Sequence, residues 1–170
     1  MSHMEIKFIF EDKTIESKEL SNAHGGAPFV WNIVAKKYLG LAPGAYLFES
    51  EKIWPLYKKN EMPLHHKAVL LMTYDGAVIT KPYFKKAAQD IRAFLADFKQ
   101  ESQSESRINH WNEIAQELEK DPGCAAVGFY WTSVGEDPFQ GSYDEESEDY
   151  LPFSNWGALW SVYATVEKYT

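Results

Sequence analysis

The chain has 170 residues with a formal net charge of −8, and 45% of its residues are hydrophobic. This size and composition predict one globular domain with a substantial core. The sequence contains neither an apolar run long enough for a membrane helix nor a secretory signal region, so we expect a cytoplasmic protein without a membrane partner. The single cysteine, Cys124, excludes an internal disulfide and a zinc site built mainly from thiolates. The negative charge argues against direct nucleic-acid binding, because that affinity comes largely from cations that neutralise phosphates.

The first strands are predicted from alternating apolar and polar residues. Residues 1–4, Met-Ser-His-Met, have the form of a cloning remnant, so the domain is expected over 5–170. The alternation over 5–10 predicts a half-buried strand, and a turn at 12–13 leads into a more polar strand over 14–20.

A helix and a hairpin are predicted next. The helix begins near Pro28, which suits a first turn, and ends at Gly40. A short strand is expected over 46–48. The dipeptide Asp75-Gly76, flanked by apolar runs, favours a hairpin turn between strands over 66–74 and 77–80 in the middle of the sheet.

The second half of the chain predicts two helices followed by two strands. Apolar residues recur every three or four positions over 82–99 and 107–120, which is typical of helices packed on one face. Residues 124–133 and 158–168 are expected to be strands. The loop between them, at about 134–157, has a length that usually indicates a functional or disordered segment. The predicted fold class is therefore α+β, a single domain with a mostly antiparallel sheet and about three helices packed on it.

Charge is concentrated in this second half. Residues 1–100 carry a net charge of +3, whereas residues 101–170 carry −11. Such an asymmetry indicates either an interaction surface or a solvated acidic face.

The long loop mixes acidic and aromatic side chains. Acids accelerate association with a basic surface, and aromatic side chains bury apolar area in an interface, so the mixture favours a basic protein partner. The other interpretation is that the aromatic rings fold back into the core while the acids stay solvated. The residues expected to bind the partner are Glu136, Asp137, Phe139, Tyr143, Asp144, Glu145, Glu146, Glu148, Asp149, Tyr150 and Trp156.

Motifs for catalysis or metal binding are weak. His24 and the two glycines after it are similar to the oxyanion motif of esterases, but no Gly-x-Ser-x-Gly accompanies them. His65 and His66 are expected in extended chain, where neighbours point to opposite faces and cannot easily hold one ion. His110 has no second ligand at a typical spacing. We therefore expect no cofactor, no metal ion and no catalytic residues. The alternative left open is a small hydrolase or carbohydrate-active enzyme that uses carboxylates of the acidic loop.

Three segments carry a resemblance to a known class of proteins. They are Trp-Pro-Leu-Tyr at 54–57, the apolar stretch 66–75, and Trp-Thr-Ser-Val-Gly at 131–135 with the acidic residues that follow. With the small size, the acidity and the scattered tryptophans, they resemble the immunity proteins of bacterial polymorphic toxin systems. The resemblance implies that the protein binds and blocks a cognate toxin, often a nuclease with a basic cleft, and does no chemistry itself. It implies no particular immunity family and no oligomeric state.

Overall fold

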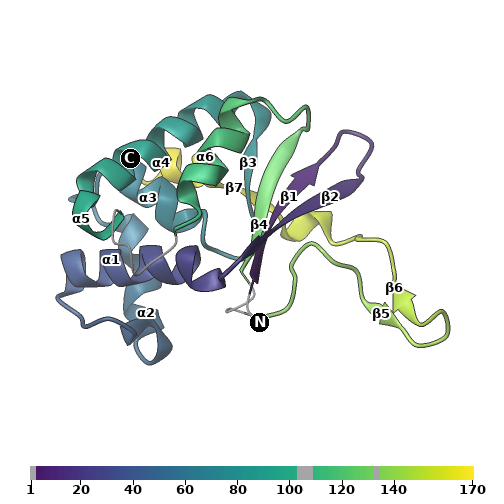
Figure 1. Cartoon of the computed structure of the whole chain (residues 1–170), viewed down its shortest axis with the longest axis horizontal. Helices are drawn as coiled ribbons and strands as arrows, with labels where there is room; N and C mark the ends of the chain where they lie inside the picture. Colours follow the sequence, from purple (N-terminus) through teal and green to yellow (C-terminus); the bar gives the residue numbers. More distant parts are fainter. Residues whose placement is uncertain (1–2, 103–108, 132–134) are drawn as a thin grey trace.

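A five-stranded sheet forms the centre of the molecule (Figure 1). The computed structural model describes residues 3–102, 109–131 and 135–170. The strand order is β2-β1-β4-β3-β7, and every pairing is antiparallel except that of β7 with β3. The strands are β1 (His3–Ile9), β2 (Ile15–Ser21), β3 (Ala77–Thr80), β4 (Ala126–Trp131) and β7 (Trp160–Ser161).

Helices gather on one side of this sheet (Figure 1). They are α1 (Ala27–Leu39), α2 (Ser50–Ile53), α3 (Leu64–Leu71), α4 (Phe84–Asp97), α5 (Lys99–Ser102), α6 (Trp111–Glu119) and α7 (Val162–Lys168). Short 3-10 segments are η1 (Ala23–Gly25), η2 (Ala45–Leu47), η3 (Trp54–Lys58), η4 (Lys81–Tyr83) and η5 (Trp156–Ala158). The α+β class is confirmed, but seven helices occur in the described ranges rather than about three.

Several predicted elements are confirmed. β1 and β2 form the expected pair, Gly40 with a φ of 65° is the C-cap of α1, and α4 and β4 lie within their predicted ranges. The predicted helix over 107–120 is observed as α6, and its first two residues lie outside the described residues. β1 begins at His3 and its Met4 is fully buried, so part of the expected cloning remnant contributes to the sheet.

The predicted hairpin over 66–80 is wrong in its first half. Residues 64–71 form the helix α3, and only β3 is a strand. The apolar run is buried from His66 to Leu71, because α3 lies among other elements rather than at the surface of the fold. A helix buried on all sides loses the amphipathic period, so its sequence looks like that of a central strand.

Two other predicted strands are also corrected. Residues 162–168 form α7, in which Val162, Tyr163 and Val166 are buried at helical spacing. The Ser161 side chain accepts a hydrogen bond from the Ala164 amide, 3.3 Å away, and caps this helix. Residues 45–47 form η2 instead of a strand, and Phe48 after it is 85% exposed.

The two faces of the sheet carry different side chains. On the face under the helices, Met4 and Ile6 of β1 lie with Phe129 and Trp131 of β4 in the main hydrophobic core. The opposite face carries the alternate residues, Glu5, Lys7 and Ile9 of β1 among them. The acidic loop covers this second face, where Phe139 packs against Ile9 and Val78. Within the described residues, no helix is long and apolar enough to cross a bilayer.

Candidate functional site

The acidic loop is attached to the outer face of the sheet through Phe139. Its ring is 4% exposed and forms a small hydrophobic cluster with Ile9 and Val78. Gly128 belongs to β4, which lies between β1 with Ile9 and β3 with Val78. It leaves room for the Phe139 ring, since a Cβ there would be 2.3 Å from Phe139 Cζ. A glycine inside a strand often marks such a close approach.

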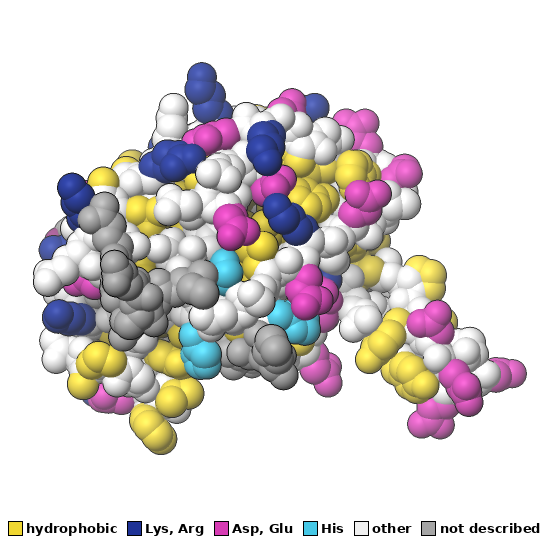
Figure 2. Space-filling model, in the orientation of Figure 1, with side chains coloured by type: hydrophobic (Ala, Val, Ile, Leu, Met, Phe, Trp, Pro, Cys, Tyr) yellow, Lys and Arg dark blue, Asp and Glu magenta, His cyan; other side chains and the backbone are white. Residues whose placement is uncertain are grey.

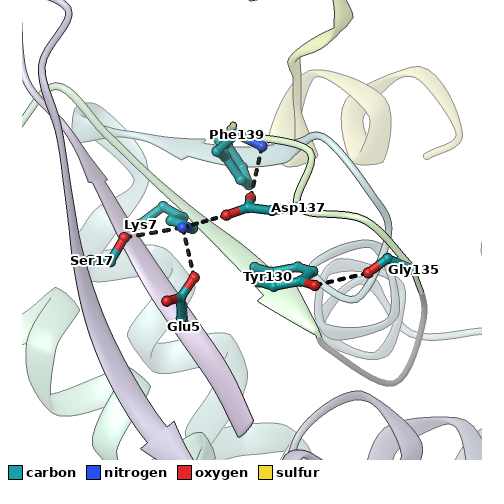
Figure 3. Close-up of polar contacts among 7 residues, drawn as sticks. All are labelled: Glu5, Lys7, Ser17, Tyr130, Gly135, Asp137 and Phe139. Carbon is teal, nitrogen blue, oxygen red and sulfur yellow. Dashed lines mark hydrogen bonds and ion pairs between the residues drawn. The ribbon is translucent and has the colours of Figure 1, made fainter. Parts of the chain in front are cut away.

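A buried lysine holds the same part of the loop (Figure 3). Lys7 Nζ lies 2.7 Å from Asp137 Oδ2, 2.7 Å from Glu5 Oε2 and 3.0 Å from Ser17 Oγ. The other Asp137 oxygen accepts the Phe139 amide hydrogen at 2.9 Å. The side chains of Lys7 and Asp137 are only 7% and 10% exposed, so the pair is shielded from solvent more than a surface ion pair is.

Tyr130 of β4 contacts the beginning of the loop. Its hydroxyl donates a hydrogen bond to the Gly135 carbonyl at 2.9 Å (Figure 3). Burial, and then the negative charges of Asp137 and Glu5, raise the pKa of the Tyr130 phenol. The phenol therefore stays protonated at neutral pH and remains a donor.

The end of the loop returns to the same face. Phe153 lies between Phe139 and Trp156, with ring centroids 6.4 Å and 4.8 Å away. Trp156 is half-buried and packs against the cluster formed by Ile9, Val78 and Phe139. Lys13 Nζ lies 5.7 Å from the centroid of the Trp156 ring. Both ends of the acidic segment are therefore fixed on the sheet by aromatic packing.

The middle of the loop forms a hairpin that extends away from the body of the molecule (Figure 1). Its strands are β5 (Tyr143–Asp144) and β6 (Asp149–Tyr150), which among the described strands pair only with each other. Tyr143 and Tyr150 face each other with ring centroids 5.3 Å apart, and they are 54% and 51% exposed. Both tyrosines are therefore accessible to a partner.

Acidic side chains surround this pair of tyrosines. Figure 2 shows them crowded on the projecting hairpin. The acids of the hairpin are Asp144, Glu145, Glu146, Glu148 and Asp149, and no Lys or Arg occurs from 121 to 167. Hydrogen bonds from the Ser147 hydroxyl and amide to the Asp144 carboxylate, at 2.7 and 3.2 Å, lower its pKa. Asp144 is thus ionised at neutral pH and contributes to the negative potential.

A polar hollow of about 420 Å³ lies where the hairpin leaves the body. Tyr143 and Tyr150 line it on the hairpin side, and Tyr130, Glu136 and Asp137 line it on the body side. The hollow is open to solvent next to the acidic tip.

The structure divides the predicted binding residues into two groups. The anchor group consists of Asp137, Phe139 and Trp156, which are buried or half-buried against the sheet. The hairpin group lies beyond it and consists of Tyr143, Asp144, Glu145, Glu146, Glu148, Asp149 and Tyr150. Glu136 is exposed and lines the hollow. The sequence analysis did not predict that Lys7 and Gly128 hold the loop. A lysine in a half-buried strand and a glycine within a strand were the signals that could have indicated it.

The other motifs have structural explanations. A Cβ at Gly26, in the esterase-like segment, would be 2.3 Å from Trp131 Cζ3, so this glycine permits close packing. His110 is buried, and its Nε2 bonds the Ser21 carbonyl. Cys124 is buried as well, and desolvation raises the pKa of its thiol, which lowers its reactivity.

The expectation that His65 and His66 lie in extended chain is wrong. Both belong to α3, and the Nε2 atoms of both rings lie within hydrogen-bond distance of Asp97 Oδ2 at the end of α4. Burial lowers the pKa of His66, and hydrogen bonding, first of all by His65, lowers the pKa of Asp97. This cluster is separate from the acidic hairpin.

Comparison of the chain with protein-family models, with curated proteins and with solved structures gave no match.

Proposed function

We propose that this protein is a cytoplasmic binding protein that neutralises a basic protein partner, in the manner of a bacterial toxin immunity protein. The partner is a cognate toxin with a positively charged surface, such as a nuclease. The protein acts by binding and not by catalysis, and it contacts neither nucleic acid nor membrane.

The observation that carries this proposal is the pair of half-exposed tyrosines within a projecting acidic hairpin. Carboxylates on a protruding element create a local negative potential that attracts a basic surface from a distance. Tyrosine buries a large apolar area and has few rotatable bonds, so it stabilises a complex after encounter at a low entropic cost.

The anchor group gives the hairpin a fixed starting point. Phe139 occupies the space above Gly128, and Asp137 pairs with Lys7. The residues at the base of the hairpin therefore lose little further conformational entropy when a partner binds. Preorganisation of this kind improves affinity without adding any contact.

The carboxylate chemistry also favours binding over hydrolysis. Asp137, whose side chain is 10% exposed, has one oxygen on Lys7 and the other on the Phe139 amide. Both oxygens are therefore occupied by structural contacts. The acids of the hairpin tip lie at the solvent-exposed surface, whereas a catalytic general acid is tuned by burial and by neighbouring groups.

The test begins with affinity capture from the native host with the wild-type protein and with a hairpin variant, followed by mass spectrometry. The hairpin variant carries Asp144→Asn, Glu145→Gln, Glu146→Gln, Glu148→Gln and Asp149→Asn. A control variant neutralises five exposed acids elsewhere, at Glu11, Glu16, Glu51, Glu61 and Glu113, and has the same net charge. We expect the partner to be recovered with the wild type and with the control, and to be reduced with the hairpin variant.

Association and dissociation rates measured with the captured partner separate the role of the acids from the role of the tyrosines. The hairpin variant should associate more slowly at low salt and show a much smaller difference at high salt, because salt screens exposed charges. Tyr143→Ala and Tyr150→Ala should mainly increase the dissociation rate. If the folded hairpin variant associates at the wild-type rate at low salt, the acidic hairpin is not the binding surface.

A further inference from the structure

Three helices bring a cluster of polar side chains together on the side of the molecule opposite the hairpin. Figure 1 shows α3 and the end of α4 at the left, far from β5 and β6. His65 and His66 lie in the first turn of α3, Asp97 is the last residue of α4, and Tyr38 comes from α1. Within the described residues, this cluster is one of two groups of His, Cys, Asp and Glu side chains close enough to share one ion.

Ligand atoms of the cluster converge on one point. His65 Nε2 lies 2.5 Å from Asp97 Oδ2, and His66 Nε2 lies 2.7 Å from the same oxygen. The three atoms all lie within 4.8 Å of one another. Catalytic zinc sites typically have three protein ligands, and two imidazole nitrogens with one carboxylate oxygen are one such donor set.

The orientation of His66 is fixed by its surroundings. Its side chain is 2% exposed, and its Nδ1 atom lies 2.6 Å from the Tyr38 hydroxyl. The ring packs against Phe94 and Phe98, with centroids 5.4 and 5.0 Å away. Metal-binding histidines typically have the second ring nitrogen held by a hydrogen bond and an apolar shell around the ring, and His66 has both.

Solvent can reach the other side of the cluster. The side chains of His65 and Asp97 are 26% and 47% exposed. Bond lengths in tetrahedral zinc sites place neighbouring ligand atoms roughly 3.3 Å apart, so the Asp97 oxygen would have to withdraw by less than about 1 Å. Asp97 ends its helix and is half-exposed, which permits this movement.

We propose that His65, His66 and Asp97 form a binding site for one Zn²⁺-type divalent cation, with a fourth coordination position open to water. Tyr38 is a positioning residue that orients His66. Nitrogen donors favour zinc and similar transition metals over Mg²⁺ and Ca²⁺, which prefer oxygen ligands. This site departs from the sequence-based expectation of no metal, which depended on an extended chain at His65 and His66.

Cobalt binding tests the site, because Co²⁺ in a tetrahedral site absorbs visible light. The measurements use the full chain with His3→Gln, since His3, Glu5 and Glu19 form the other possible metal group. We expect one Co²⁺ per chain, displaced by Zn²⁺, and a melting temperature that rises with added Zn²⁺ because the ion binds the folded state.

Variants at the exposed ligands identify the residues involved. His65→Gln and Asp97→Asn should weaken Co²⁺ binding at least tenfold and abolish the Zn²⁺-dependent rise in melting temperature. His24→Gln, at an exposed histidine outside the cluster, is the matched control and should bind normally. Tyr38→Phe should retain the site with Co²⁺ affinity reduced roughly tenfold or more, as for other residues that orient a ligand.

Two results would overturn the proposal. One is the absence of a Co²⁺ absorption band and of stabilisation by Zn²⁺, which would mean that the cluster only joins α3 to α4. The other is binding that His65→Gln and Asp97→Asn leave unchanged, which would place the ion elsewhere. His66 is not varied because its burial would make the fold itself sensitive to the change.

Discussion

At the residue scale, a single glycine, Gly128, allows the acidic loop to pack against the sheet. The Phe139 ring lies over Gly128, where a Cβ would be 2.3 Å from Phe139 Cζ. We expect Gly128→Ala to lower the free energy of unfolding by about 1–3 kcal/mol, the usual cost of overpacking. Urea denaturation measures the change.

Gly157→Ala is the control for this substitution, because a Cβ at Gly157 has no neighbour within 4 Å in the described residues. It should leave the urea midpoint nearly unchanged. If both variants unfold at the same midpoint, Phe139 does not pack on β4 in solution.

Asp137 is also a residue whose role is structural. Asp137→Ala removes one of the two carboxylates that neutralise Lys7 and leaves a lysine that is 7% exposed with Glu5 alone. Because losing a partner of a buried polar group is costly, we expect a decrease of about 1–3 kcal/mol in the free energy of unfolding. Thermal or chemical denaturation detects it.

The comparison for Asp137 is Glu145→Ala on the exposed hairpin. A surface substitution of this kind usually changes stability by less than about 0.5 kcal/mol. Equal stabilities of the two variants would show that the Lys7–Asp137 pair contributes nothing to the fold.

At the scale of elements, the turn between α3 and β3 depends on Gly76. It has a φ of 75°, and a Cβ there would be 2.8 Å from the Ala158 carbonyl oxygen. The Gly76 carbonyl also accepts the Trp160 amide hydrogen at 3.0 Å, which joins this turn to β7. The sequence predicted a turn at this position correctly, although a helix rather than a strand precedes it.

We expect Gly76→Val to lower the free energy of unfolding by more than about 1 kcal/mol, because a β-branched residue resists a positive φ. Gly40→Val has a similar φ of 65°, but within the part of the chain that the structure describes the added Cβ has no neighbour within 4 Å. Melting curves of both should show the larger loss for Gly76→Val, and the difference reports the contact with residue 158. A Gly76→Val protein that melts with the wild type would contradict this turn.

At the scale of the whole molecule, the acidic hairpin and the folded body are separable. β5 and β6 pair only with each other, and the segment 143–150 contributes none of the buried core side chains. Replacing 143–150 with a Gly-Ser linker of equal length removes five acids and no base, which changes the net charge from −8 to −3.

The melting temperature of this replacement variant should stay close to that of the wild type, since loop composition at an exposed tip affects stability little. Binding to the basic partner should be lost. Loss of folding instead of binding, seen by circular dichroism, would show that the hairpin belongs to the stable body.

The elements predicted correctly share a physical feature. β1, α4 and α6 each have at least seven residues and bury one face, so their apolar residues repeat with the period of the element. α3 is buried nearly all round and α7 has only seven residues, so neither has a helical period long enough to distinguish it from a strand. In the structure the Ser161 side chain caps α7 by accepting the Ala164 amide hydrogen.

The sequence by itself determined the α+β class, the positions of the strands β1 to β4 and of the helices α1, α4 and α6, and the concentration of acids and aromatics in one loop. Only the tertiary structure separated the anchor group from the hairpin group, because Asp137 meets Lys7 across 130 positions of sequence. The cluster of His65, His66 and Asp97 was decided in the same way, by the meeting of α3 with the end of α4. Local patterns report which face of an element is buried, whereas contacts between distant segments depend on how the elements pack together.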